Sequence, residues 1–428
     1  MAETDLNSSP PLAPAIIPSP NDRRSARAAE SPPHLGGSQL SRTANRRCSA
    51  TRPRPPFECI ALLLQGGGAL GAYQAGVYEA LAESDLHPDW VAGISIGAIN
   101  GALIAGNAPE ARVDKLRAFW EGITAQPWWN WSERTNSLLQ GDAAQQWFNQ
   151  FNAGLALVAG APGFFTPRLP PPWLHPPGTP DAASIYDTSG LKATLERLID
   201  FDRINASGMR FSVGAVNVRS GNFVYFDTKT HTIAPEHIMA SGALPPGFPA
   251  IEIEGEHYWD GGLVSNTPLQ WVVDSQPRLD TLAFQVDLWS ARGDLPRTLA
   301  EVSTRQKEIQ YSSRTRASTD SFKYVQRLRR ATADLLEKLP DHLRHGPEAE
   351  LLRTAVDRKV YNIVHLIYRA KTYEGHSKDY EFSRASMVEH WRAGYHDAIR
   401  TLRHPEVLER PTNHEGVSTF DLARDGRE

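Results

Sequence analysis

Cysteine is scarce in this chain of 428 residues, which contains only two. Cys48 and Cys59 lie on either side of a proline-rich junction, and they indicate neither a disulfide framework nor a metal site. We therefore expect no bound metal and a reducing compartment.

Long hydrophobic runs are also missing. The longest apolar stretch, 91–106, is interrupted by Ser95 and Asn100 and contains too many glycines for a transmembrane helix. Residues 1–8 include acidic side chains, and no apolar segment follows them, so no secretory signal is predicted. The prediction is a cytoplasmic protein, and peripheral association with the inner membrane stays open.

An excess of basic residues is absent as well. Lysine and arginine number 45 against 49 aspartates and glutamates, which gives a net charge of −4. Without a global positive field, nucleic acid is not an expected partner. The length suffices for one large domain with additions or for two domains.

The first 56 residues have the composition of a disordered tail. Residues 1–56 contain ten prolines, eight serines and eight arginines, and they show no hydrophobic periodicity. Eight arginines against four acidic residues leave the segment mildly basic. It is expected to be a solvated leader, with contact to an anionic surface as the alternative.

The stretch that organises the sequence is 61–106. A short apolar run, 61–64, stops at three glycines, 66–68, and the apolar residues that follow take a helical spacing. A second apolar run, 90–94, ends at Ser95 and leads directly into small, apolar residues. This order predicts a strand, a glycine turn, a helix, a second strand, and then a serine on a strand-to-helix corner.

Ser95 has the surroundings of a nucleophile. Gly93 and Gly97 flank it in the pattern G-x-S-x-G, which lets the backbone turn sharply and leaves the hydroxyl exposed. The helix that follows directs unpaired N–H groups and its positive dipole end toward the serine oxygen. The alternative is a tight turn in an α/β core, since this pattern occurs by chance in roughly one chain of this length in seven. The strand before Ser95 and the helix after it favour the nucleophile.

The glycine loop before Ser95 has two interpretations. The motif G-x-G-x-x-G at 66–71 fits a dinucleotide-binding fingerprint. That fingerprint needs an acidic residue at the end of the second strand, whereas Asp89 precedes this strand and Ser95 ends it. We favour an oxyanion hole formed by the backbone N–H groups of Gly67 and Gly68, because glycines allow the main chain to approach a substrate oxygen closely.

A second stretch with catalytic potential is Asp260-Gly261-Gly262, which follows a predicted hairpin. An aspartate at a strand end before two glycines can present its carboxylate, although Asp-Gly is also common in ordinary turns. Ser95 needs a proton acceptor, and none of the fourteen histidines has a comparable setting. His257 lies three residues before Asp260 and therefore points to the opposite face of the strand. A dyad of Ser95 and Asp260 is the simplest hypothesis.

Tryptophan and proline are concentrated in 108–187. Six of the eleven tryptophans fall in this fifth of the chain, namely Trp120, Trp128, Trp129, Trp131, Trp147 and Trp173. Tryptophan suits an apolar site with a wet rim. The insertion is therefore predicted to form a wall or lid at an acyl-chain pocket or a membrane interface, with ordinary packing as the alternative.

The last third of the sequence returns to regular patterns. A strand over 281–288 is expected to be the last of the sheet, and 299–339 has a long, heavily charged helical pattern. A further strand is predicted over 361–368, and an amphipathic helix over 383–402. The basic residues of the long helix are expected on a solvated face, with an anionic lipid surface as the alternative. They are Arg314, Arg316, Lys323, Arg327, Arg329 and Arg330.

Four motifs together resemble the patatin-like phospholipase family over about 57–275. They are Gln65-Gly66-Gly67-Gly68-Ala69-Leu70-Gly71, Gly93-Ile94-Ser95-Ile96-Gly97, Ala240-Ser241-Gly242-Ala243-Leu244-Pro245 and Asp260-Gly261-Gly262, in this order. The resemblance implies a three-layer α/β/α sandwich with a mostly parallel central sheet. It implies phospholipase A or lipid acyl hydrolase activity without a cofactor. It also implies that Ser95 and Asp260 form a catalytic dyad, with Gly66, Gly67 and Gly68 at the oxyanion hole.

The sequence departs from the family at Leu70, where patatin-like proteins usually have arginine or lysine. The missing cation leaves a preference for phospholipids over neutral esters open. Some bacterial members of the family are similar to this chain in having an added C-terminal region.

The expected organisation is a tail at 1–56, a catalytic domain at 57–290 that includes the insertion, and a mainly helical C-terminal region at 291–428. The expected function is hydrolysis of a lipid or small ester through an acyl-enzyme. Two alternatives stay open, a lipid- or membrane-binding adaptor on the same fold and a dinucleotide-binding protein.

Overall fold

The computed structural model describes residues 54–125, 142–206, 208–370, 374–375 and 377–422. These described residues belong to one compact unit. The predicted tail falls almost entirely outside them, as do Trp128, Trp129 and Trp131 of the insertion.

A nine-stranded sheet in the order β11-β10-β9-β1-β2-β5-β8-β7 forms the centre of the unit, with β6 paired to β5. The parallel strands are β1 (Cys59–Leu64), β2 (Trp90–Ile94), β5 (Arg210–Asn217), β9 (Thr281–Asp287), β10 (Tyr361–Ile367) and β11 (Val417–Phe420). The antiparallel strands are β6 (Phe223–Asp227), β7 (Ile251–Ile253) and β8 (Glu256–Asp260). A separate two-stranded sheet joins β3 (Thr166–Pro167) to β4 (Tyr186–Asp187). The predicted mostly parallel α/β sheet is confirmed.

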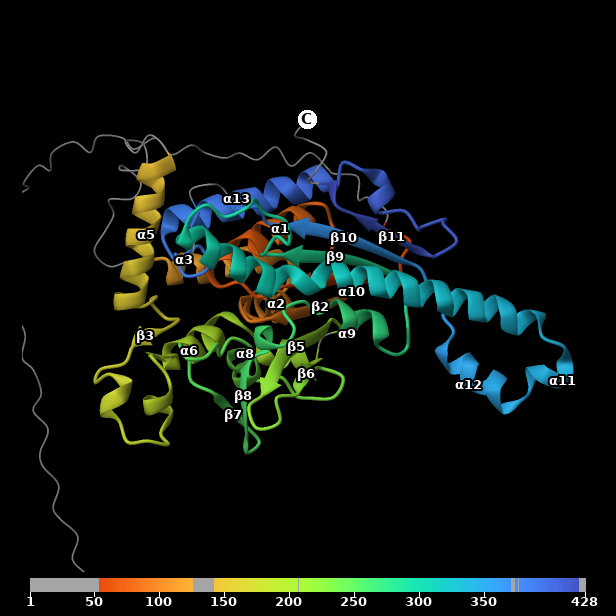
Figure 1. The fold of residues 1–428 in the computed structure, drawn as a ribbon, viewed down its shortest axis with the longest axis horizontal. Helices are drawn as coiled ribbons and strands as arrows, with labels where there is room; N and C mark the ends of the chain where they lie inside the picture. The colour runs from red at the N-terminus through yellow and green to blue at the C-terminus, as the bar shows by residue number, and fades with distance from the viewer. Residues whose placement is uncertain (1–53, 126–141, 207, 371–373, 376, 423–428) are drawn as a thin grey trace, which may run out of the picture. The chain divides into compact units, whose positions relative to one another are not determined.

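Helices cover both faces of the sheet (Figure 1). The side chains of β1 alternate between two apolar clusters, with Ile60 and Leu62 in one and Ala61 and Leu63 in the other. The first cluster includes α1 (Ala72–Glu83), α2 (Ile96–Ala105), α3 (Arg112–Ile123) and α13 (Arg384–Thr401), and the second includes α9 (Leu269–Asp274) and α10 (Leu299–Lys338). Because parallel strands bury both faces, apolar runs such as that of β1 form them readily.

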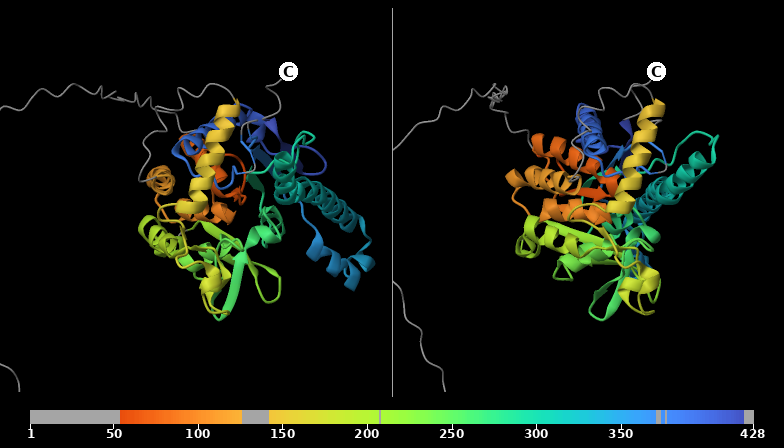
Figure 2. Two further views of the ribbon diagram at one scale, coloured as in Figure 1. Left: turned by 60° about the vertical axis from the view of Figure 1, so that its left-hand side comes forward. Right: turned by 90° about the vertical axis from the view of Figure 1, so that its left-hand side faces the viewer.

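Six helices remain in the described residues, of which the first four also contribute buried side chains to the first cluster and the last two contribute to neither. They are α5 (Asp142–Ala159), α6 (Ser189–Leu198), α7 (Phe201–Ala206), α8 (Pro235–Ser241), α11 (Asp341–Arg344) and α12 (Pro347–Ala355). Figure 2 shows α5, which belongs to the insertion, as an upright helix beside one end of α10. The predicted helices at 299–339 and 383–402 are confirmed, and the Ser383 hydroxyl caps the second by accepting a hydrogen bond from the Ser386 N–H.

The prediction that 281–288 is the last strand is wrong. β10 pairs with β9 along its whole length, and β11 pairs with β10, so β9 lies inside the sheet. Every residue of β9 is buried, as expected for a strand with neighbours on both sides. The sheet therefore continues across residue 290, and the two parts predicted as a catalytic domain and a C-terminal region share it.

The close packing of α1 against α13 joins these two parts on one face of the sheet. A Cβ atom at Gly76 would lie 1.9 Å from the carbonyl oxygen of Trp391, and one at Gly394 would lie 2.0 Å from that of Tyr73. Each helix thus has a glycine where the other helix's backbone approaches, which a larger residue would prevent.

Candidate active site

Ser95 occupies the corner between β2 and α2. Its backbone has φ 56° and ψ −125°, a conformation that is uncommon for a residue with a side chain. A Cβ atom at Gly93 would lie 2.3 Å from the carbonyl oxygen of Gly97, and one at Gly97 would lie 2.3 Å from that of Leu64. Both flanking residues must therefore be glycine because the backbone passes so close. The predicted strand-to-helix corner is present, and Ser95 is only partly buried on it.

A second serine fixes the backbone of this corner. The Ser95 N–H donates to the hydroxyl of Ser241 at 2.9 Å, and that hydroxyl donates to the carbonyl of Gly214 at 2.6 Å. Ser241 is the last residue of α8 and is fully buried. The strained conformation of Ser95 is thus held by α8 and β5 together.

Strand register brings Asp260 to Ser95 across 165 positions of sequence. In β5, Gly214 pairs with Ile94 of β2, and the next residue, Ala215, pairs with Asp260 at the end of β8. The Ser95 side chain lies close enough to the Asp260 carboxylate to lower the pKa of that group, so the two side chains are neighbours. The structure therefore places the two predicted dyad members together.

The Asp260 carboxylate is buried, with 3% of the residue exposed. Its Oδ1 accepts a hydrogen bond from the Gly262 N–H at 2.7 Å. Burial raises the pKa of Asp260 to about 6, while the hydrogen bonds from Ser95 and from Gly262 act in the opposite direction. A carboxylate with such a pKa is a stronger base than an exposed aspartate and is still ionised at neutral pH.

The three loop glycines differ in whether their N–H groups are free. The Gly66 N–H donates to Oδ1 of Asn266 at 3.1 Å, and Nδ2 of Asn266 donates back to the Gly66 carbonyl at 3.0 Å. Among the described residues, no acceptor takes the N–H of Gly67 or of Gly68. Of the three glycines predicted at the oxyanion hole, Gly66 therefore has its N–H occupied by Asn266, and Gly67 and Gly68 are the candidate donors.

Buried amide side chains fix the glycine loop to the segments around it. Oε1 of Gln65 accepts from the N–H groups of Leu288 and Trp289 at 2.7 and 3.1 Å, and its Nε2 donates to the Tyr311 carbonyl at 3.1 Å. The network also includes Gln74, Asn100, Trp120 and Asn266. Sequence reasoning missed these roles. The available signal was amide residues within otherwise apolar segments, as at Gln65 and Asn100.

A segment of the C-terminal region, here called the strap (residues 377–382), packs directly on the glycine loop. The Asp379 carbonyl accepts the Ala69 N–H at 2.8 Å. Lys307 of α10 binds both carboxylate oxygens of Asp379 at 3.0 Å, and Lys378 binds Glu308 at 2.6 Å. The strap therefore contacts the loop directly and is itself fixed to α10 by these ion pairs.

Replacing Gly68 by alanine is expected to cost more stability than its backbone angle alone predicts. Gly68 has φ +56°, which costs a residue with a Cβ about 1–2 kcal/mol, and that Cβ would lie 2.1 Å from the Asp379 carbonyl oxygen. We expect a lower Tm and at least about a tenfold lower kcat, because the loop or the strap must move. Thermal unfolding and ester hydrolysis measure the two effects.

Gly221→Ala is the matched control for this change. Gly221 also has a positive φ, +70°, but no atom lies within 4 Å of its added Cβ. It should lose only the backbone contribution and keep full activity. Equal losses of Tm in the two variants would contradict the contact with the strap.

The dinucleotide interpretation does not fit this geometry. Asp89 lies at the start of β2, where its carboxylate accepts the Ile60 N–H at 2.7 Å and contacts Arg54. This position is at the opposite edge of the sheet from the glycine loop, so Asp89 cannot reach a ribose bound there. Within the described ranges, no group of three or more His, Cys, Asp or Glu side chains is arranged to hold a metal ion.

Leu70, which stands where the family usually has a cation, is fully buried, so this position faces the core.

The tryptophans of the insertion that the structure describes differ in their exposure. Trp120 is fully buried and donates to Asn100, as ordinary packing requires, whereas Trp173 is 80% exposed. No helix in the described part of the chain combines the length and the apolar composition needed to span a bilayer.

The fold and the corner at Ser95 define an α/β protein with a serine presented beside a glycine loop. Comparison with known families agrees with this class. A model described as patatin-like phospholipase matches residues 62–272, and one described as patatin phospholipase matches residues 309–414. The chain belongs to the patatin-like phospholipase family, and the resemblance seen in the sequence is confirmed.

Relatives share only short segments with this chain. The lysophospholipase nte1 of Aspergillus terreus is 51% identical over 49 residues, which is 11% of this chain and 3% of that protein. Patatin-like phospholipase domain-containing protein 7 of Mus musculus is 43% identical over 67 residues, 15% of this chain and 5% of its own length. A patatin-like phospholipase domain-containing protein of Neosartorya fischeri is 35% identical over 104 residues, covering 22% of this chain and 14% of that protein.

One solved structure with a similar arrangement is VipD from Legionella pneumophila. It has a TM-score of 0.32 and 15% sequence identity, and the alignment covers 86% of this chain and 75% of that one.

Proposed function

We propose that this chain is a serine acyl hydrolase that cleaves lipid ester bonds through Ser95 and Asp260. The observation that carries the proposal is the position of Ser95 beside the buried carboxylate of Asp260, whose pKa is raised by burial to about 6. Family membership supports a lipid hydrolase as the general activity. The position of Ser95 at the N-terminus of α2 adds a positive dipole end beside the reacting oxygen.

The proposed first step forms the acyl-enzyme. Asp260 takes the hydroxyl proton of Ser95 while the serine oxygen attacks the ester carbonyl carbon. The negative charge on the carbonyl oxygen is stabilised by the N–H groups of Gly67 and Gly68, where a single such donor typically contributes about 2.7–4 kcal/mol. When the tetrahedral intermediate collapses, the carbon–oxygen bond to the alcohol breaks, and the alcohol leaves with the proton from Asp260.

The second step releases the acid. A water molecule gives one proton to Asp260 and attacks the acyl carbon, and the proton returns to Ser95 as its bond to the acyl group breaks. The proposed mechanism uses no metal or cofactor. The carboxylate must therefore act as base and acid in turn, and a pKa near 6 suits both roles.

Exposed apolar side chains in the insertion support contact with a lipid surface. Leu169, Trp173 and Leu174 are 88, 80 and 66% exposed in the segment between β3 and β4. Trp173 has the amphipathic ring that is enriched at membrane interfaces. We include peripheral membrane association in the proposed function on this ground.

The test is ester turnover together with covalent labelling of the serine. The full chain should hydrolyse p-nitrophenyl butyrate, and a fluorophosphonate probe should label one peptide, the one containing Ser95. Vesicle binding without turnover or labelling would instead favour the adaptor alternative. A thermal shift with NAD in the absence of labelling would favour the nucleotide-binding alternative.

The activity should depend on pH through Asp260. Only the deprotonated carboxylate can accept the Ser95 proton, so kcat/KM should fall as pH decreases through the pKa of about 6. We expect half of the maximal kcat/KM near pH 6, a plateau above about pH 7.5, and a roughly tenfold loss for each pH unit below 5. A profile that stays flat from pH 5 to pH 8 would contradict Asp260 as the base.

A further inference from the structure

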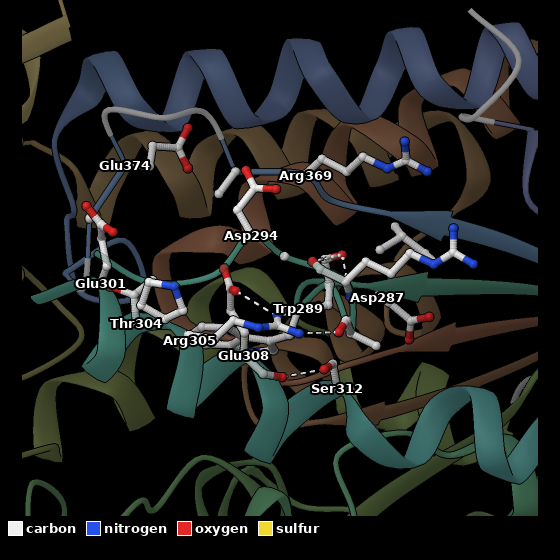
Figure 3. A pocket seen from close by; sticks show the side chains of 18 of the residues that line it. Asp287, Trp289, Asp294, Glu301, Thr304, Arg305, Glu308, Ser312, Arg369 and Glu374 are labelled. Carbon is white, nitrogen blue, oxygen red and sulfur yellow. Dashed lines mark hydrogen bonds and ion pairs between the residues drawn. The ribbon is translucent and has the colours of Figure 1, made fainter. Parts of the chain in front are cut away.

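A large cavity opens at the carboxyl ends of β9, β10 and β11, beside the proposed active site. Its volume is about 1550 Å³, and its lining comes from these strand ends, the loop after β9, α5, α10 and the segment after β10. Figure 3 shows carboxylates and guanidinium groups from several of these elements facing the same space. In parallel α/β sheets, the carboxyl edge is where ligands bind. Neither Ser95 nor Asp260 lines the cavity.

The wall between the cavity and the glycine loop is one side chain thick. Trp289 lines the cavity, and its Nε1 donates to the Gly66 carbonyl at 3.0 Å. The same nitrogen lies 3.2 Å from the position of a Cβ on Gly67. Tyr380 of the strap also lines the cavity, next to the residue whose carbonyl binds the loop. The cavity therefore begins where the proposed oxyanion hole ends.

Helix α10 joins the two spaces in the same way. Glu308 and Ser312 line the cavity, and Tyr311 lies between them in sequence. Burial raises the pKa of Tyr311, and the charge of Asp260 raises it further, so Tyr311 lies near the proposed base. Tyr311 also packs against Trp289, with ring centroids 5.4 Å apart and the ring planes tilted by 31°. A molecule that reacts at Ser95 thus has the cavity as its neighbouring space along α10.

A buried carboxyl group lies on the cavity floor. Asp287 is 1% exposed, and its carboxylate oxygens accept hydrogen bonds from Nε2 of Gln285 at 3.1 and 2.9 Å. Nδ1 of His365, on β10, lies 3.7 Å from Oδ2 of Asp287. This nitrogen is buried and has no hydrogen-bond partner among the described residues. The pair provides polar groups that water or a ligand can bind.

Positive charge lies beside it at the ends of β10 and β11. Lys323 of α10 donates to the hydroxyl of Thr419 at 2.7 Å, and in the described residues it forms no ion pair with a carboxylate. Arg369, which follows β10, lies 3.5 Å from Asp421, and its side chain is 46% exposed. Both residues line the cavity. Each side chain has further N–H groups that can donate hydrogen bonds, and such charged donors bind a phosphate more strongly than a neutral group.

We infer that this cavity binds the polar, zwitterionic head group in the alcohol half of the ester that Ser95 cleaves. This inference rests on the proposed function. An acyl chain in the cavity would remove water from Asp287, Lys323 and Arg369 and would leave their remaining hydrogen-bonding capacity unused, which is costly. An anion alone would pair with the two cations but would be opposed by carboxylates that also line the cavity, such as Glu308 and Asp421. A phosphate joined to an ammonium group can pair with both the cations and the carboxylates of the lining. The cavity has room for it, since its volume exceeds the roughly 300–1,000 Å³ of a typical small-ligand pocket.

The kinetic test compares a substrate that has a head group with one that has none. Arg369→Met and Lys323→Met should each lower kcat/KM for lysophosphatidylcholine about tenfold or more. Hydrolysis of p-nitrophenyl butyrate, which has no head group, should stay within twofold of the unaltered protein. Arg400→Met is the matched control, because Arg400 is also 46% exposed and pairs with Asp397 at 3.3 Å, but it lies on α13 away from the cavity.

A binding test needs no turnover. Glycerophosphocholine, glycerol 3-phosphate and glycerol are titrated calorimetrically into the Ser95→Ala protein, with and without Arg369→Met. We expect glycerophosphocholine to bind most tightly, with a Kd raised tenfold or more by Arg369→Met and unchanged by Arg400→Met.

The outcomes separate this inference from the proposed function. If the Met variants leave lysophosphatidylcholine hydrolysis unchanged, or lower it together with p-nitrophenyl butyrate hydrolysis, the head-group site is refuted while the hydrolase stands. Tighter binding of glycerol 3-phosphate than of glycerophosphocholine would also refute it, in favour of a simple phosphate site. If the unaltered protein cleaves neither ester, the proposed function fails and the head-group site fails with it.

Discussion

Ser95→Ala should reduce kcat for ester hydrolysis by about 10⁴-fold or more, because it removes the only atom that can form the acyl-enzyme in the proposed mechanism. The fold should survive. The Ser95 N–H keeps its bond to Ser241, and alanine keeps the Cβ that already fits this corner. The residual rate reports what Gly67 and Gly68 contribute without a nucleophile. Measurements of p-nitrophenyl butyrate hydrolysis and of Tm give the two results.

Two other serines separate chemistry from structure in this experiment. Ser241→Ala removes the acceptor of the Ser95 N–H and the donor to the Gly214 carbonyl. It should lower kcat by only about tenfold, with a lower Tm, since two buried hydrogen bonds are lost. Ser220→Ala, in the exposed turn between β5 and β6, should change neither quantity. Activity of Ser95→Ala within tenfold of the unaltered protein would mean that another residue is the nucleophile.

The parts of the site that sequence reasoning predicted are those encoded locally. Gly93 and Gly97 are needed because the backbone folds back within five residues, and such a requirement leaves a short motif. The order of strand, loop and helix from 59 to 105 is likewise specified by neighbouring residues. The distant partner, Asp260, was predicted by eliminating the histidines and by resemblance, and no local pattern shows that it reaches Ser95.

The parts that could not be predicted depend on contacts between distant segments. Asn266 binds Gly66 across 200 positions, and the Asp379 carbonyl binds Ala69 across 310. A backbone carbonyl as partner leaves no residue type to recognise, so the strap has no sequence signature. The place of β9 inside the sheet also depends on β10 and β11, which come 74 or more positions after its end.

The C-terminal region contributes to the site and is not only an addition to the fold. The two stretches that match family models, 62–272 and 309–414, meet at the glycine loop, where Asp379 contacts Gly68 and Ala69. Lys307 and Lys378 link α10 and the strap through ion pairs that are largely shielded from solvent. The geometry of the proposed oxyanion hole therefore depends on residues from both stretches.

Asp260→Asn should lower kcat by about 10³–10⁴-fold, comparable to the loss when an aspartate in a serine hydrolase triad becomes asparagine. Asparagine has nearly the same shape, and its oxygen can still accept the Gly262 N–H, so the local structure should be kept. It cannot take a proton from Ser95. The pH dependence of the residual rate should lose its inflection near pH 6, and an unchanged inflection would assign that pKa to another group.

The same substitution should stabilise the fold at alkaline pH, in contrast to its effect on activity. Burial raises the pKa of Asp260 from 3.8 to about 6, so the folded state binds the proton more tightly than the unfolded state. Above pH 6 the buried charge therefore destabilises the fold by up to about 3 kcal/mol, whereas below about pH 4 both states are protonated and this cost disappears. Tm of Asp260→Asn should exceed that of the unaltered protein at pH 8 and approach it at pH 4. Asp274→Asn, at a more exposed position, is the control. If the Tm difference between Asp260→Asn and the unaltered protein is smaller at pH 8 than at pH 4, burial does not destabilise the carboxylate.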